Sequence, residues 1–172
     1  MTPPTNHPIS RKVGETMTNE IDNERFPSRK HPRLKAYDYS TPNYYFVTIC
    51  TWQKTCLFGS PGKLNHYGRI AEQGILQIEN HFPNARVDKF VVMPNHIHLI
   101  LELQTKGASL SDIIGQYKAF VTKEARKTKP SLKLWQTSFH DHVIRNQKSY
   151  ETIWLYIEAN PYNWEEDCFF EE

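Results

Sequence analysis

The sequence predicts an α+β fold, an antiparallel sheet with helices on one side of it. Segments of strand-like and helical character follow one another in the order β-α-β-β-α-β-α, which is typical of such a sandwich. Two of the strands, 85–93 and 96–103, are separated only by Pro94 and Asn95, and this favours a tight hairpin. A length of 172 residues suits one domain with one core. We therefore expect a single domain over residues 36–172.

The N-terminal half should contain a tail, a strand and a helix. Residues 1–35 are polar, hold five of the eleven prolines and lack apolar periodicity, so a flexible tail is expected. Aromatic and β-branched residues predict the first strand at 44–52, and a Gly/Pro turn follows at 59–62. One helix is expected over 64–82, because apolar side chains recur there at helical spacing: Ile70, Ile75, Ile78 and Phe82.

The C-terminal half should contain two helices with a strand between them. Ser109 followed by Asp112 resembles a capping box at the start of a helix, and Pro130 is expected to end that helix. A loop and a strand are expected within 132–145. The last helix should cover 148–160, where the sequence Asn160-Pro161 stops it. Its buried stripe is formed by Tyr150, Ile153, Trp154 and Ile157.

Two histidines stand two residues apart in the strand 96–103. Because side chains alternate along a strand, His96 and His98 share one face with Ile100 and Glu102, and the apolar residues between them form the core face. Two neutral imidazoles on one rigid surface are half of a divalent-metal site. The same spacing is compatible with a pair of histidines on a solvated sheet face.

The three cysteines, Cys50, Cys56 and Cys168, are odd in number and show no C-x-x-C spacing. This favours a reduced, intracellular protein over a disulfide scaffold. A zinc site made of Cys50, Cys56 and the two histidines is an alternative, although the cysteine spacing does not suit a zinc knuckle. No apolar run resembles a signal peptide or a membrane span, so a cytoplasmic, nucleoid-associated location is expected.

The charged residues are unevenly distributed, although the net charge is only +2. Seven basic residues against two acidic ones lie between positions 106 and 133, and six acidic residues without a basic one lie from position 158 onward. A basic middle region favours a surface that faces a polyanion, and a solvated helix face is the alternative. The candidates for phosphate contacts are Lys118, Lys123, Arg126 and Lys127.

Tyr156 differs from most of the nine tyrosines by its place on the last helix. It lies about 110° from the centre of the apolar stripe, at an edge where a side chain can reach past the core. Asn160 lies one turn further along the same flank. A hydroxyl and an amide oxygen on this edge could approach a metal held by the two histidines, and in that arrangement Asn160 is the third ligand and Tyr156 the attacking group. The alternative is a half-buried tyrosine and a helix-ending asparagine.

Segments in the second half of the chain resemble a known family. Met93–His98, MPNHIH, resembles the His-hydrophobic-His motif of the HUH single-tyrosine transposases, in the REP-associated branch (RAYT proteins). The segment 156–161, YIEANP, is similar to the family's Tyr-Ile-x-x-Asn-Pro segment. Trp135-Gln136 and 141–146, DHVIRN, are similar to its Trp-Gln and acidic-His-x-Ile-Arg-Asn segments. The resemblance covers about residues 39 to 164.

One position departs from the family's pattern. His140 stands where the family usually has an aromatic residue, and it creates a second His-x-His together with His142. Only His142 matches the family's pattern, and it is expected near the site or the DNA. We therefore assign the metal to His96 and His98.

The resemblance implies the HUH-endonuclease fold, a ferredoxin-like sandwich, and a metal-dependent transposase or endonuclease. Tyr156 would be its nucleophile and Asn160 a metal ligand, with Mg²⁺ or Mn²⁺ as cofactor. The expected substrate is single-stranded DNA near palindromic hairpin repeats, cut and rejoined through a 5′-phosphotyrosine bond by a monomer or homodimer. Trp135, His142 and Arg145 are further candidates for DNA contacts, with core packing as the alternative for Trp135. A non-catalytic, sequence-specific DNA-binding regulator and a replication-initiating or relaxase-type nuclease are the rival functions.

Overall fold

A four-stranded sheet forms the centre of the computed structural model, which describes residues 37–167 and 169–170. Its strands are β1 (Asn43–Cys50), β4 (Ala85–Val92), β5 (His96–Leu103) and β6 (His140–Ile144). They lie in the order β4-β5-β1-β6, and every neighbouring pair is antiparallel. The hairpin expected around Pro94 and Asn95 is therefore present. The tail expected at residues 1–35 lies outside the described residues.

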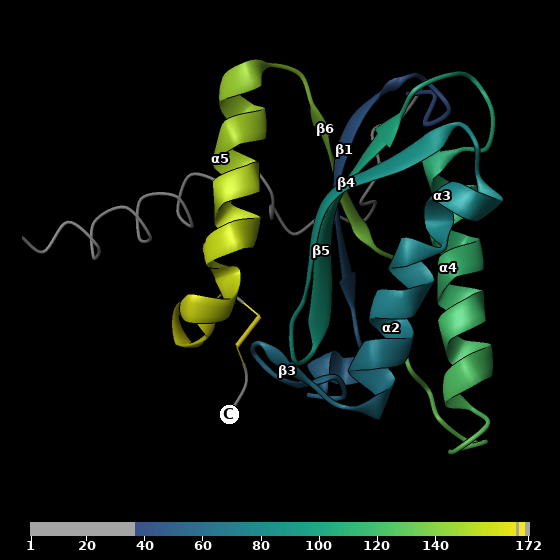
Figure 1. Cartoon of the computed structure of the whole chain (residues 1–172), viewed down its shortest axis with the longest axis vertical. Coiled ribbons are helices and arrows are strands. Elements are labelled where there is room, and N and C mark those ends of the chain that lie inside the picture. Colours follow the sequence, from purple (N-terminus) through teal and green to yellow (C-terminus); the bar gives the residue numbers. More distant parts are fainter. Residues whose placement is uncertain (1–36, 168, 171–172) are drawn as a thin grey trace, which may run out of the picture.

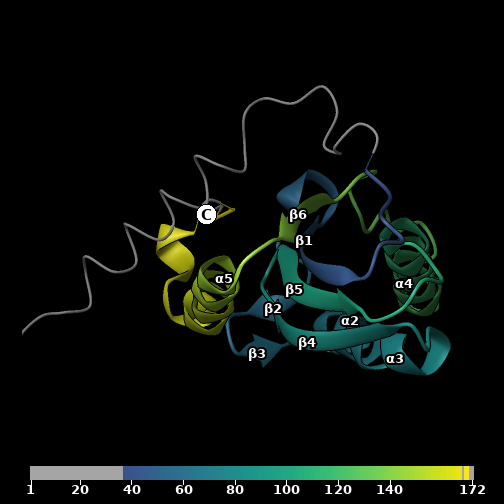
Figure 2. The ribbon, with the colours of Figure 1, turned by 90° about the horizontal axis from the view of Figure 1, so that it is seen from above.

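Helices cover both faces of this sheet (Figure 1, Figure 2). On one face lie α2 (His66–Leu76), α3 (Ile78–His81) and α4 (Leu110–Ala125), packed on the main hydrophobic core. On the other face lies α5 (Gln147–Ala159), packed on a smaller apolar cluster. The α+β class is confirmed, but the expectation that all helices lie on one side is wrong. The apolar stripe of α5 predicts that the helix is amphipathic, and it carries no information about which face of the sheet it covers.

The two faces of β5 differ as the alternation predicts. Ile97 and Leu99 belong to the main core beneath α2 and α4, together with the other apolar residues in their register. Ile100 belongs to the cluster beneath α5. Since side chains two apart in a strand share a face, His96 and His98 point to the α5 side of the sheet.

Two elements near the start of the domain differ from the sequence prediction. The first strand ends at Cys50, because Thr51 forms an isolated bridge to Trp135 and a 3-10 turn, η1 (Trp52–Lys54), follows it. The turn at 59–62 is a small hairpin of β2 (Gly59–Ser60) and β3 (Lys63–Leu64).

The two long helices on the core side also end earlier than the sequence predicts. The helix expected over 64–82 is divided at Gln77 into α2 and α3. The capping box that starts α4 is present, since Ser109 Oγ accepts the backbone N–H of Asp112 and Asp112 Oδ2 accepts that of Ser109. The end of α4 is different, because Arg126 is its C-cap and the helix stops well before Pro130.

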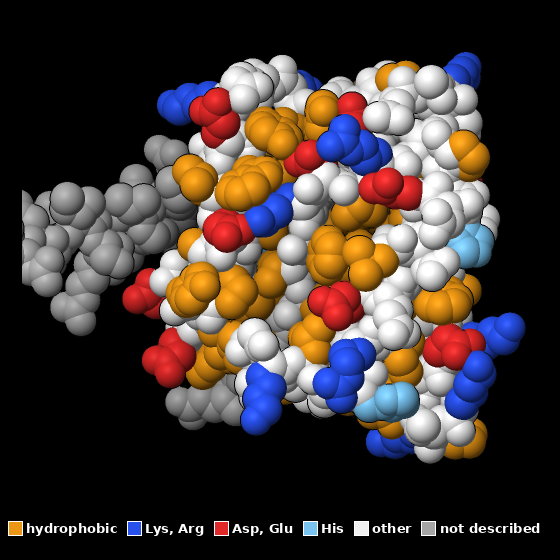
Figure 3. Space-filling view, viewed as in Figure 1, with side chains coloured by type: hydrophobic (Ala, Val, Ile, Leu, Met, Phe, Trp, Pro, Cys, Tyr) orange, Lys and Arg blue, Asp and Glu red, His pale blue; other side chains and the backbone are white. Residues whose placement is uncertain are grey.

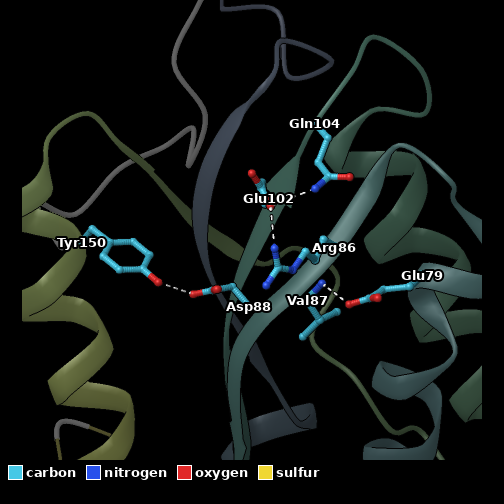
Figure 4. Close-up of polar contacts among 7 residues, drawn as sticks. All are labelled: Glu79, Arg86, Val87, Asp88, Glu102, Gln104 and Tyr150. Atoms are coloured by element: carbon cyan, nitrogen blue, oxygen red, sulfur yellow. Dashed lines mark hydrogen bonds and ion pairs between the residues drawn. The ribbon is translucent and has the colours of Figure 1, made fainter.

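Polar contacts hold α5 against the edge strand β4. The hydroxyl of Tyr150 donates to Asp88 Oδ2 at 2.6 Å (Figure 4). Lys89 forms an ion pair with Glu158, and its ammonium lies 3.9 Å from the ring centroid of Trp154. These contacts set the rotation of α5 about its own axis, which aims the opposite edge of its last turns at the histidines of β5.

Within the part of the chain that the structure describes, no helix combines the length and the hydrophobicity needed to cross a bilayer.

Candidate metal centre and nucleophile

His96 and His98 lie in a closed site between β5 and α5. Both side chains are 0% exposed, and their ring centroids are 4.4 Å apart. The alternative of two histidines on a solvated sheet face is therefore excluded. Phe169 contributes to the enclosure, because its ring lies 4.7 Å from that of His96.

A hydrogen bond defines which nitrogen of His96 is available. Asn95 Nδ2 donates to the carbonyl oxygen of Phe169 at 2.7 Å, so the Oδ1 of Asn95 faces Nδ1 of His96 at 2.8 Å. Because an amide oxygen only accepts, Nδ1 of His96 carries the proton and Nε2 keeps its lone pair. Nε2 is buried and has no hydrogen-bond partner among the described residues. A buried lone pair without a donor is what a metal ligand presents before the ion binds.

Burial keeps His96 in the neutral form that binds metals. It lowers the pKa of His96 to about 4, although the nearby carboxylate of Asp167 acts in the opposite direction. His98 is held in a comparable way, since its Nδ1 lies 2.8 Å from the hydroxyl of Thr48 on the neighbouring strand. Each imidazole thus has one nitrogen fixed by a neighbour and Nε2 turned toward α5.

Tyr156 on α5 reaches this pair from the opposite side. Its phenol oxygen lies 3.2 Å from Nε2 of His98 and 3.1 Å from Oδ2 of Asp167. The side chain is 7% exposed, and its ring meets Phe46 of β1 edge-on. The edge position that the sequence predicts therefore brings the phenol to the histidines, although the residue is more deeply buried than a half-exposed flank would be.

Asn160 is the first residue of η2 (Asn160–Tyr162), directly after α5. Its Nδ2 donates to Asp167 Oδ2 at 2.6 Å, which leaves Oδ1 buried and without a partner among the described residues. Two unpaired buried acceptors, this Oδ1 and the Nε2 of His96, thus occur in one site. The structure brings together the four residues that the sequence singled out.

Asp167 is a site residue that the sequence reasoning did not identify. It follows η3 (Trp164–Glu166) and is 6% exposed, in contrast to the exposed acids before it. One ligand atom each from His96, His98 and Asp167 lies within 4.8 Å of the others. No pattern marks this carboxylate, which is one of several acids in the acidic C-terminal run, and only its contacts reveal it.

The donor set fits a divalent ion. Two imidazole nitrogens, an amide oxygen and a carboxylate oxygen are borderline and hard ligands that suit Mn²⁺, and less closely Mg²⁺. Among the described residues, this is the one group of at least three histidine, cysteine or acidic side chains that could hold an ion. It contains neither Cys50 nor Cys56, so the zinc alternative with two cysteines is not supported. His140 and His142 also lie outside it.

The sequence and fold of this chain are similar to those of known proteins. The model of the family described as IS200-like transposases matches residues 39–160. The chain belongs to this family. An uncharacterized Haemophilus influenzae protein is 37% identical to it over 167 residues, which cover 83% of this chain and 93% of that protein. A second H. influenzae protein, whose name assigns it to the REP-associated tyrosine transposases, is 26% identical over 134 residues, 72% of this chain and 73% of that one.

Two solved structures share the fold of this IS200-like family member. The structure of a REP-associated tyrosine transposase bound to a REP hairpin has a TM-score of 0.56 and 21% identity, and covers 78% of this chain and 74% of that one. A Deinococcus radiodurans crystal structure, of a protein assigned as a transposase, has a TM-score of 0.50 and 18% identity, and covers 75% and 97%. The family resemblance and the fold expected from it are confirmed.

The basic residues that the sequence proposed for phosphate contacts lie on the other side of the sheet from the histidines in this IS200-like chain (Figure 2). All four are on α4 or at its end, and α4 covers the sheet face opposite to α5 (Figure 2). A hollow of about 590 Å³ lies along this part of the chain, lined by Lys118, Ala119, Thr122, Lys123, Arg126 and Trp135. The candidate catalytic residues and the candidate phosphate contacts therefore occupy opposite faces of the domain.

Some of these side chains already have partners within the protein. The ammonium of Lys118 donates to the carbonyl oxygens of Gln136, Thr137 and Ser138, and burial lowers its pKa. Arg126 donates through Nε to the carbonyl oxygen of Leu132. Lys118 thus ties α4 to the following loop, whereas Lys123 is exposed.

Trp135 is part of the core packing. It is 8% exposed, its indole N–H donates to the carbonyl oxygen of Lys118 at 3.1 Å, and its ring packs near Phe58 and Tyr117. Little of the ring is left for stacking on a base.

His142 lies in β6, the second edge strand of the sheet, and Arg145 directly follows this strand. His142 is opposite Phe46 in the register of β1 and β6, so it faces the same side of the sheet as His98. Arg145 follows β6 and is exposed. Of the residues that the sequence proposed for DNA contacts, His142 and Arg145 therefore lie on or near the sheet face that α5 covers.

Proposed function

We propose that this protein is a metal-dependent transposase or endonuclease that cleaves and rejoins single-stranded DNA near palindromic hairpin repeats. The observation that carries the proposal is the convergence of a phenol, an amide oxygen and two imidazole nitrogens in one buried site. These groups come from β5, α5 and η2, and no packing requirement brings polar atoms without partners together in an apolar cluster. Membership in the IS200-like transposases supports the same reading.

His96, His98 and Asn160 would hold the divalent ion, Mg²⁺ or Mn²⁺. When bound there, such an ion would neutralise a non-bridging oxygen of the scissile phosphate and orient the phosphorus for in-line attack. The imidazole of His96 is ready to bind without losing a proton at neutral pH, because burial lowers its pKa. Asn95 and Thr48 would keep both rings in the orientation that presents Nε2.

Tyr156 would carry out the covalent step. Its oxygen would form a bond to phosphorus while the bond from phosphorus to the 3′ oxygen breaks, which gives a 5′-phosphotyrosine and a free 3′-hydroxyl. The phenol proton must leave, and Asp167 Oδ2 lies within hydrogen-bonding distance of it, whereas the lone pair of His98 Nε2 would be occupied by the ion. Because the phosphotyrosine bond retains the energy of the phosphodiester, attack by a 3′-hydroxyl would rejoin the strand.

The DNA substrate would contact two separate surfaces. A single strand is needed at the centre, since a duplex would hold its backbone away from a buried tyrosine. Lys123, Arg126 and Lys127 would bind phosphates on the α4 side, and His142 and Arg145 would do so near β6. The structure of a REP-associated tyrosine transposase bound to a REP hairpin, which has a similar fold, supports a hairpin substrate.

The test is incubation of the full chain with a labelled single-stranded hairpin oligonucleotide in Mn²⁺ or Mg²⁺. We expect a covalent protein–DNA adduct that survives denaturation, requires the ion and is absent for Tyr156→Phe. A chain that binds the hairpin tightly but never forms an adduct with either ion would contradict the proposal.

The second candidate is a non-catalytic, sequence-specific DNA-binding regulator that retains the fold. The observation in its favour is the enclosure of the centre, since His96 and His98 are fully buried and Phe169 lies over His96. A strand that reaches the phenol must displace side chains that enclose it. Binding without cleavage, unchanged by Tyr156→Phe and by removal of the ion, would favour the regulator.

A further inference from the structure

We propose that Asp167 is itself a ligand of the divalent ion, supplied from the segment after the tyrosine helix. The inference deepens the proposed function and rests on it, because it concerns the same ion. It changes the chemistry of the site, since two imidazoles and an amide are neutral, whereas a carboxylate adds one negative charge. The ion would then be held in the absence of DNA rather than only together with a phosphate.

The first argument is the environment of the carboxylate. Asp167 is 6% exposed, and among the described residues no lysine or arginine forms an ion pair with it. Three neutral donors surround it: the hydroxyl of Tyr156, the amide of Asn160 and the backbone N–H of Phe169. A buried carboxylate with hydrogen bonds but no ion-pair partner is costly, and a divalent cation beside it would offset that cost.

The second argument is distance. The ligand atoms of His96, His98 and Asp167 lie within 4.8 Å of one another. Ligands bound at about 2.1 Å on opposite sides of one ion are about 4.2 Å apart, and adjacent ligands are closer. At most one pair can lie on opposite sides, and adjacent ligands are about 3 Å apart, so the three atoms would have to approach one another by less than about 2 Å to share an ion.

The third argument is the orientation of Asn160. By accepting from Nδ2, Asp167 turns Oδ1 of Asn160 toward the interior, where that oxygen has no partner. The Nε2 of His96 is unpaired in the same site. The carboxylate of Asp167 thus lies beside both unpaired acceptors. Such a set of acceptors is expected where a cation, rather than a hydrogen-bond donor, binds to all of them.

The direct test is equilibrium binding of Mn²⁺ alone to the full chain, by paramagnetic resonance of free Mn²⁺ or by calorimetry. We expect Asp167→Asn, which keeps the shape of the side chain, to weaken Mn²⁺ binding by about tenfold or more. Glu165→Gln is the matched control, because it removes the charge of an exposed acid two residues away. Equal affinity of the wild type and Asp167→Asn would overturn the inference.

A second variant separates ligation from mere positioning of Asn160. Asp167→Cys should bind Cd²⁺ and gain an ultraviolet thiolate-to-cadmium charge-transfer band over the wild-type chain, because a soft thiolate prefers Cd²⁺. A side chain that only orients Asn160 would give no new band, and that result would refute ligation. If the wild type binds no Mn²⁺ at all, the metal-dependent function itself fails, whereas loss of the Asp167 effect alone leaves it intact.

Discussion

The phenol oxygen of Tyr156 lies 3.2 Å from Nε2 of His98, although the two residues are 58 positions apart in the chain. One comes from the central strand β5 and the other from the helix that covers it. Since both are buried, the contact is a property of the folded core and not of a mobile surface loop. It gives the proposed chemistry a defined starting geometry.

Replacing Tyr156 by Phe should abolish the covalent DNA adduct and leave Mn²⁺ binding almost unchanged, because the phenol is the attacking group and not a ligand. The adduct is measured on denaturing gels with a labelled hairpin oligonucleotide. Tyr150→Phe is the control on the same helix. It removes the hydrogen bond to Asp88 and should lower the free energy of unfolding by about 1–2 kcal/mol while adduct formation persists. Adduct formation by Tyr156→Phe would mean that another residue is the nucleophile.

Replacing Asn95 by Ala should weaken Mn²⁺ affinity by about 10- to 100-fold, although Asn95 is not a proposed ligand. Its Oδ1 accepts from Nδ1 of His96, and without it the ring is free to turn or to exchange its tautomer. Thr48→Val removes the corresponding contact to His98 and should act in the same direction. Calorimetric titration with Mn²⁺ measures both, and full affinity in both variants would show that the rings need no such orientation.

The free energy of unfolding should fall as the pH is lowered from about 6.5 to about 4 in metal-free buffer. Burial lowers the pKa of His96 from 6.5 to about 4, so between these values the unfolded chain binds the proton and the folded chain does not. At about 1.4 kcal/mol for each pKa unit, the loss attributable to this residue is about 3 kcal/mol.

Urea unfolding at several pH values tests this dependence. His96→Gln should flatten the curve in this range, whereas His66→Gln, which changes an exposed histidine on α2, should leave its shape unchanged. An identical pH dependence in the wild type and His96→Gln would assign the effect to other groups.

Replacing Lys123 by Ala should weaken hairpin binding without a change in Mn²⁺ affinity. The slope of the logarithm of the DNA-binding constant against the logarithm of the salt concentration should become smaller by about one. Lys123 is exposed on α4, on the sheet face opposite to the histidines. Lys118→Met should act differently, because the ammonium of Lys118 bonds to three loop carbonyls, so its loss should lower stability. Binding titrations at several salt concentrations, beside urea unfolding, distinguish the two. An unchanged salt slope for Lys123→Ala would remove α4 from the DNA surface.

Apolar side chains are also exposed on and beside α5, and the sequence analysis assigns them no role. Between α5 and the sheet, hydrophobic side chains are interspersed with acidic and basic groups on the face seen in Figure 3. Trp154 and the half-exposed Leu155 of α5 contribute to the exposed apolar area of this helix. The same helix carries Tyr156 on its buried side, so one element serves both the surface and the centre.

The local features of this protein can be predicted from short stretches of its sequence. Alternation in β5 placed both histidines on one face, the four-residue spacing placed Tyr156 and Asn160 on one flank, and Ser109 with Asp112 marked the start of α4. Each of these follows from the periodicity of a strand or a helix or from a short-range hydrogen bond, and such information lies within a few neighbouring residues.

Which faces of the elements meet depends on how the whole chain folds. The strand order β4-β5-β1-β6 and the path of the chain after β6 put α5 over the histidines and the bases of α4 on the far side of the sheet. They also brought Asp167 to a site whose other members lie up to 71 residues earlier, from His96 onward. Long-range burial and hydrogen bonding select such contacts, and no periodicity within the acidic C-terminal run distinguishes that carboxylate from its neighbours.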